Sequence, residues 1–83
     1  MSNHPNRGWR ARWTIDAARR EARHGPSGLV VRFRPDAGEP GAWDGDAVNG
    51  AEVAEALAER HGADAPRMLA RLMREAGEAW SER

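Results

Sequence analysis

The sequence predicts an α+β fold, in which a short antiparallel β-meander of two or three strands packs on a C-terminal antiparallel helix hairpin. In residues 9–35, apolar and polar residues alternate with a period of two, which is typical of half-buried strands. In residues 49–80, apolar residues recur at helical spacing between residues typical of helix ends. The 83 residues are enough for one domain with a small core, so these elements should pack together.

The alternation predicts two strands directly. The first covers residues 9–16, where the odd positions are apolar and the even positions are polar. The second covers residues 29–34, and Pro35 ends its ladder. Residues 17–28 fit either a helix or a third strand between two turns. We favour the third strand, because two strands alone make a poor sheet.

Residues 36–48 are rich in glycine, proline and aspartate, which predicts a loop. Asn49 is positioned to cap a first helix that Gly62 ends, and Asp64 is positioned to cap a second helix. Because the link between the helices is short, we expect them to be antiparallel neighbours. The expected single domain over residues 1–83 has a flexible tail at 1–8, a β-rich part at 9–35, a loop at 36–48 and a helix hairpin at 49–80.

Composition excludes several chemistries. The chain has no cysteine, which excludes disulfides and thiolate metal sites. It has no lysine either, so every basic side chain is a planar guanidinium fork suited to phosphate or carboxylate. No apolar run reaches membrane-spanning length and the first residues lack a signal-peptide core, so we expect a cytoplasmic protein that does not bind membranes.

The formal net charge of zero hides a division along the chain. Residues 1–35 hold eight arginines against two carboxylates, whereas residues 36–83 hold five arginines against eleven carboxylates. This asymmetry indicates either a basic or acidic binding surface, or two halves that neutralise each other in the fold.

The main candidate binding site is an arginine-bearing face of the predicted sheet. If the apolar face of each strand covers the helices, the polar face points outward with its arginines, which would attract phosphate or an acidic protein patch. The alternative is a solvated face partly paired with Asp16 and Glu21. Trp9 and Trp13 fall on the opposite face, which argues against a base-stacking platform. The candidate residues are Arg10, Arg12, Arg32 and Arg34, joined by Arg20 and Arg23.

A second candidate surface is a stripe of arginines on the second predicted helix. Glutamates at positions 52, 55 and 59 line one side of the first helix, so antiparallel neighbours would bridge the two stripes with exposed ion pairs. The functional alternative is a docking stripe made of Arg67, Arg71 and Arg74.

Three other motifs lack residues that their chemistry requires. The stretch from Asp44 to Glu55 has the length of a calcium loop, but Asn49 stands where that loop requires glycine. The histidines lack zinc-ligand spacing. His24 and Ser27 suggest a base and a nucleophile, but no oxyanion loop or third partner is apparent. We therefore expect no catalytic residue, no metal, no cofactor and no enzymatic activity.

Several residues between Trp13 and Trp80 resemble a pattern in small uncharacterised proteins of GC-rich proteobacteria, some of them phage-associated. The resemblance rests on the closing segment RMLARLMREAGEAW and on Trp13, Thr14, Ala22, His24, Gly28, Leu29, Val31 and Phe33. It implies a meander followed by helices and supplies no activity. A phage association would imply a small protein that modulates a host or phage complex, such as an inhibitor of bacterial defence.

Taken with the arginine face, these observations predict a non-enzymatic binding module that docks onto a protein or nucleoprotein partner. One alternative is nucleic-acid binding through phosphates, without sequence specificity. Another is a self-associating structural protein, in which Met68, Met73 and Trp80 are only partly buried within one chain. We expect a monomer or a weak homodimer.

Overall fold

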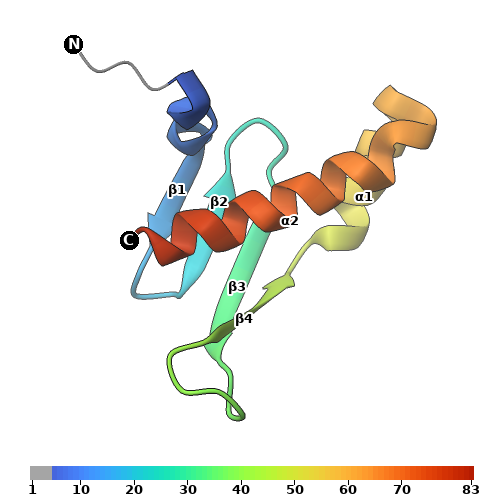
Figure 1. Cartoon of the computed structure of the whole chain (residues 1–83). Coiled ribbons are helices and arrows are strands. Elements are labelled where there is room, and N and C mark those ends of the chain that lie inside the picture. The colour runs from blue at the N-terminus through green and yellow to red at the C-terminus, as the bar shows by residue number, and fades with distance from the viewer. Residues whose placement is uncertain (1–4) are drawn as a thin grey trace.

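The computed structural model describes residues 5–83, so residues 1–4 of the expected tail lie outside the described part. The chain forms an antiparallel four-stranded sheet in the order β1-β2-β3-β4, covered on one face by helix (Figure 1). In order, the elements are η1 (Pro5–Arg12), β1 (Trp13–Asp16), β2 (Glu21–His24), β3 (Val30–Pro35), β4 (Trp43–Ala47), α1 (Gly50–His61), η2 (Gly62–Asp64) and α2 (Ala65–Ser81).

The α+β class is confirmed, but the prediction of two or three strands is wrong because the expected loop at 36–48 contains β4. This strand pairs with β3 in the register Phe33↔Gly45 and Arg34↔Asp44. A Cβ atom on Gly45 would lie 2.7 Å from the Phe33 ring, so only glycine fits at this position of the strand. An apolar side chain there would have indicated a strand in the sequence, whereas glycine indicated a loop. The third strand, β2, forms where we favoured it.

The first predicted strand is wrong for residues 9–12, which belong to the 3-10 helix η1. β1 pairs only with β2, and that ladder ends where Trp13 meets His24 and the Gly25 amide donates to the Arg12 carbonyl. Beyond this point no strand within residues 5–83 pairs with the backbone of residues 9–12. Local hydrogen bonds of a 3-10 helix satisfy backbone groups that an unpaired strand would leave open.

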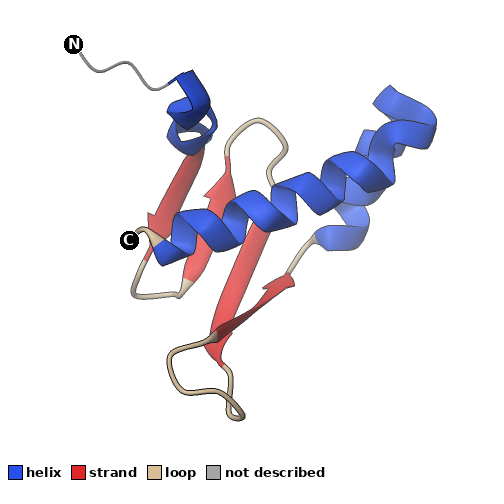
Figure 2. Ribbon diagram, viewed as in Figure 1, coloured by secondary structure: helices blue, strands red, loops and turns tan. Residues whose placement is uncertain are grey.

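The predicted helix hairpin is wrong as well. Residues 50–81 are helical throughout, because η2 continues the backbone from α1 into α2 and the three form one bent helix rather than two helices joined by a loop. Gly62, with φ of 58°, provides the bend. α2 crosses one face of the sheet, as Figure 2 shows.

The expected caps also differ. Asn49 does not cap α1 with its side chain. Instead, its Oδ1 accepts a hydrogen bond from the Val30 amide and its Nδ2 donates to the Gly28 carbonyl, both at 2.9 Å. Asn49 therefore ties the start of the bent helix to the start of β3.

The core lies between α2 and the helix-facing side of the sheet. The Phe33 and Trp80 rings are stacked with centroids 5.0 Å apart, and Trp43 meets Trp80 edge-on at 5.3 Å. Trp80 is 3 % exposed, so the sheet buries the residue that the self-association hypothesis left partly open. The other buried apolar residues are Trp13, Ala22, Leu29, Val31, Val53, Leu57, Ala65, Leu72, Ala76 and Ala79.

Candidate functional site

The face of the sheet opposite α2 carries half of the predicted arginines. Strand pairing places Arg23 on β2 with Thr14 on β1, while Arg32 and Arg34 lie on β3. All three arginine side chains are exposed. We call this surface the outer face; its polar residues are Thr14, Asp16, Glu21, Arg23, Arg32, Arg34, Asp44 and Asp46.

Glu21 is buried on this otherwise exposed face. Its Oε1 accepts hydrogen bonds from Nε and Nη2 of Arg23, at 3.3 and 2.9 Å. Its Oε2 accepts from Nε and Nη2 of Arg32, at 3.1 and 2.7 Å. The glutamate is 2 % exposed, whereas the two arginine side chains stay 48 % and 58 % exposed. Glu21 thus fixes two guanidinium groups in defined orientations. It binds each group through Nε and Nη2 and does not use Nη1.

These arginines set the charge state of Glu21. The hydrogen bonds from Arg32 and then Arg23 lower the pKa of Glu21 below its ordinary value, and the opposing effect of desolvation is smaller. The carboxylate is therefore ionised at neutral pH. The pair of arginines and Glu21 together carry one net positive charge.

On the outer face as a whole, carboxylates slightly outnumber arginines. Arg34 lies 3.8 Å from Asp46, with both side chains 70 % exposed, and Asp44 is its direct cross-strand partner. Asp16 is the cross-strand partner of Glu21. Three arginines therefore share the face with four carboxylates. Of the two carboxylates that the alternative named, Glu21 binds the face arginines, whereas Asp16 pairs with Arg19 of the β1–β2 turn.

The remaining predicted sheet arginines lie elsewhere. Arg10 and Arg12 belong to η1, where Arg10 donates to the Trp13 carbonyl at 3.2 Å and lies 3.5 Å from Glu82. Arg20 occupies the turn between β1 and β2, and its guanidinium carbon is 5.6 Å from the centre of the Trp43 ring. The predicted set of six is thus split between the outer face, η1 and one turn.

The arginine stripe of α2 does not bridge to α1. Arg71 lies 3.8 Å from Glu75 on its own helix. Among the described residues, neither Arg67 nor Arg74 forms an ion pair, and both are exposed. The helix bends instead of forming a hairpin, and the expected bridges to the glutamates of α1 are absent from the described ion pairs.

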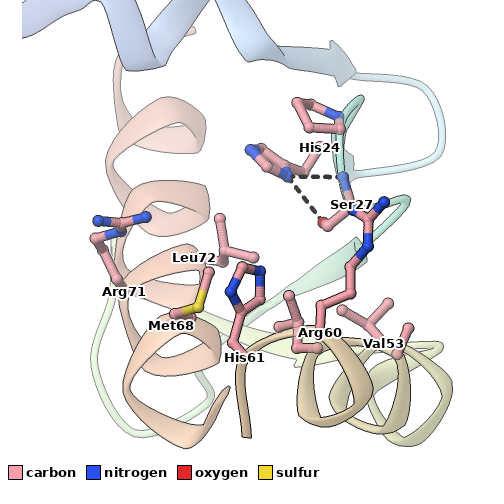
Figure 3. Close-up of a pocket in the computed structure, with 11 residues that line it drawn as sticks. His24, Ser27, Val53, Arg60, His61, Met68, Arg71 and Leu72 are labelled. Atoms are coloured by element: carbon pink, nitrogen blue, oxygen red, sulfur yellow. Dashed lines mark hydrogen bonds between the residues drawn. The ribbon is translucent and has the colours of Figure 1, made fainter. Parts of the chain in front are cut away.

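The sequence did not indicate a cleft between the bent helix and the β2–β3 turn, which has a volume of about 290 Å³ (Figure 3). We call it the helix-bend cleft. In Figure 3, His24 and Ser27 lie on one side, and Met68 and His61 lie on the other. Its apolar lining consists of Pro26, Val53, Ala56, Leu57, Met68 and Leu72; its polar lining consists of His24, Ser27, Arg60, His61 and Arg71.

His24 and Ser27 lock the turn beside this cleft. The Ser27 amide donates to His24 Nδ1 at 3.3 Å, which assigns that nitrogen as an acceptor and places the ring proton on Nε2. The Ser27 hydroxyl also lies 2.8 Å from Nδ1 and accepts from the Leu29 amide at 3.1 Å. Because the hydroxyl and ring serve the turn backbone, this geometry explains the local fold without a nucleophile.

Burial keeps His24 neutral. The side chain is 8 % exposed, its ring centre lies 4.8 Å from that of Trp13, and desolvation lowers its pKa. The charge of Glu75 opposes this effect, while Arg12 and Arg71 add to it. Glu75 itself accepts a hydrogen bond from Trp13 Nε1 at 3.0 Å.

A polar recess adjoins the helix-bend cleft and shares His24 and Arg71 with it. It is also lined by Arg12 of η1 and by Glu75 of α2. Arg12 and Arg60 form no ion pair with any described residue, although both line this region. The cations here are therefore less neutralised than those of the outer face. The Gly-Pro-Ser-Gly segment at 25–28 predicted the turn that forms one wall of the helix-bend cleft, but not the cleft itself.

Within residues 5–83, no three histidine or carboxylate side chains are grouped so that they would hold a metal ion. In the same range no helix combines the length and apolar character that crossing a membrane requires. Comparison with known protein families, curated proteins and solved structures found no match to this chain.

Proposed function

We propose that this protein is a non-enzymatic binding module that docks onto another protein through the outer face of its sheet. The observation that carries the proposal is the buried Glu21 on that exposed face. It holds Arg23 and Arg32 in fixed orientations before any partner arrives. Pre-ordered side chains lose less conformational entropy on binding than mobile ones.

The charge pattern favours a protein partner over a polyanion. A nucleic acid would meet four carboxylates together with the three arginines, and phosphate binding depends on a net excess of cations. A protein surface with charges of both signs can complement such a face. The exposed Nη1 ends of Arg23 and Arg32 suit a carboxylate of the partner.

Affinity capture tests this function with variants that leave Glu21, Arg23 and Arg32, the Glu21 cluster, unchanged. The double variant Thr14→Trp, Arg34→Glu adds bulk and reverses charge at two exposed positions of the outer face. Arg74→Glu is the matched control on α2, where the arginine forms no ion pair with a described residue. The lysates should come from both phage-infected and uninfected cells, so that host and phage proteins are both offered as partners.

We expect a protein that the unmodified chain and Arg74→Glu both retain and that the double variant releases. Retention of the same proteins by all three chains would overturn the proposal. So would retention of nucleic acid alone, recognised by its loss after nuclease treatment and by steep weakening with salt. Light scattering provides a further check, since a stable dimer that buries Thr14 and Arg34 would make the outer face a self-association surface.

A further inference from the structure

We propose that the helix-bend cleft binds a small apolar molecule that carries one carboxylate. The site is separate from the outer face, since it lies on the helix-covered side between the bend and the β2–β3 turn. Its volume of about 290 Å³ lies near the lower end of the range for ligand pockets, which fits a small molecule.

The apolar part of the cleft accepts a hydrocarbon or aromatic group. Leu57 and Val53 come from α1, while Met68 and Leu72 come from α2, so the bend itself forms the two walls. Methionine adapts to ligand shape and contacts aromatic rings favourably. Burial of an apolar group against these side chains supplies the main driving force.

Charge defines the other end of the ligand. Arg60 lines the cleft, is exposed, and has no ion-pair partner among the described residues. In Figure 3 its side chain extends from α1 toward Ser27. The guanidinium fork of Arg60 is therefore placed to bind the carboxylate of a ligand that lies near the β2–β3 turn. His61 and Arg71 add cations or donors to the lining, and the one carboxylate nearby, Glu75, is already engaged by Trp13 and Arg71.

Binding of hydrocinnamate to the ¹⁵N-labelled full chain, followed by NMR, tests the proposal. The matched probe is hydrocinnamamide, which has the same shape without the charge. Because only the carboxylate forms a salt bridge with the Arg60 guanidinium, hydrocinnamate should bind about tenfold more tightly than the amide. The saturable shifts should be confined to the amides of the β2–β3 turn and of the two helical arms at the bend.

Three variants separate the roles of the cleft. Arg60→Gln should reduce the affinity for hydrocinnamate to that for the amide, while Arg67→Gln, a cation outside the cleft lining, should leave both affinities unchanged. Ala56→Phe should block both probes by filling the cleft from an exposed position on its lining. Equal affinities for the two probes, an absence of saturable shifts, or unchanged binding to Arg60→Gln would overturn the proposal.

Discussion

The outer face and the helix-bend cleft use arginine in opposite ways. On the outer face, Arg23 and Arg32 are bound to the buried carboxylate of Glu21, and Arg34 lies beside Asp46. Around the cleft, Arg60 makes no ion pair with any described residue. The same side chain is therefore a structural and orienting element on one surface and an available cation on the other.

The difference follows from what surrounds each group. Antiparallel pairing sets the residues of neighbouring strands side by side, so Glu21 comes directly opposite Arg32 and next to Arg23. The helical arms of the cleft present apolar side chains between their cations, and no carboxylate belongs to the described lining of the cleft. Stability should therefore depend on Glu21 and its two arginines in the outer face, and ligand affinity on the cations of the cleft.

The largest expected effect comes from Glu21→Gln. Because this change removes charge-assisted hydrogen bonds from a buried group, it should lower the free energy of unfolding by about 2 kcal/mol. Arg60→Gln should change it by less than about 0.5 kcal/mol, since Arg60 forms no ion pair with any described residue. Chemical denaturation measures both free energies. Glu59→Gln, at an exposed position of α1, is the control for loss of a carboxylate. Equal effects of the two variants would remove the contrast between the surfaces.

Acid should erase the contribution of Glu21. Its folded-state pKa lies below the ordinary value of 4.5, so the stabilisation is present above 4.5 and is lost as the pH falls through the lower folded value. The stability difference between the unmodified chain and Glu21→Gln should shrink accordingly. Urea unfolding over a pH series measures it; a difference that stays constant into acid would contradict the assignment.

His24 should produce a smaller effect with the same sign. Burial lowers its folded-state pKa below 6.5, so its contribution is complete above 6.5 and declines as the pH falls through the folded value. The stability of the unmodified chain should therefore fall with acidification in this window, by at most about 1.4 kcal/mol per pH unit from one site. His24→Gln should flatten this slope. The same series of unfolding curves compares the two chains, and equal slopes would contradict the assignment.

On the outer face, Arg34→Gln should have a far smaller effect than Glu21→Gln. Its ion pair with Asp46 is 3.8 Å long and both partners are mostly exposed, so the free energy of unfolding should change by less than about 0.5 kcal/mol. Thermal unfolding of the variant and the unmodified chain would reveal any loss of stability larger than this. A loss comparable to that of Glu21→Gln would show that the whole outer face, rather than the Glu21 cluster, stabilises the sheet.

The periodic parts of the fold could be predicted from the sequence. The alternation around Val31 predicted β3, and the apolar stripe through Leu72 predicted α2. β4 was missed because Gly45 must lie against Phe33, which replaces the expected apolar residue with a loop signal. The extent of β1 was overestimated, since alternation describes side chains and cannot tell whether a partner strand is present.

The arginines of the candidate site were only partly predictable. Arg32 and Arg34 share the outward face because period two holds along β3, and Arg23 joins them through the register of β2. Arg10 and Arg12 do not lie on the outer face, because residues 5–12 form η1 and not a strand. The cleft depends on the bend at Gly62, where sequence predicted a helix end, so no local pattern could reveal it.

Photocrosslinking in the native cells tests the central claim, that the outer face docks a protein, most directly. A photoreactive amino acid at Thr14 or at Asp44 samples the two edge strands of that face, and one at Ala70 samples an exposed position of α2. We predict that positions 14 and 44 crosslink to the same protein and that position 70 does not. Crosslinks from all three positions alike, or none from 14 and 44, would contradict the account.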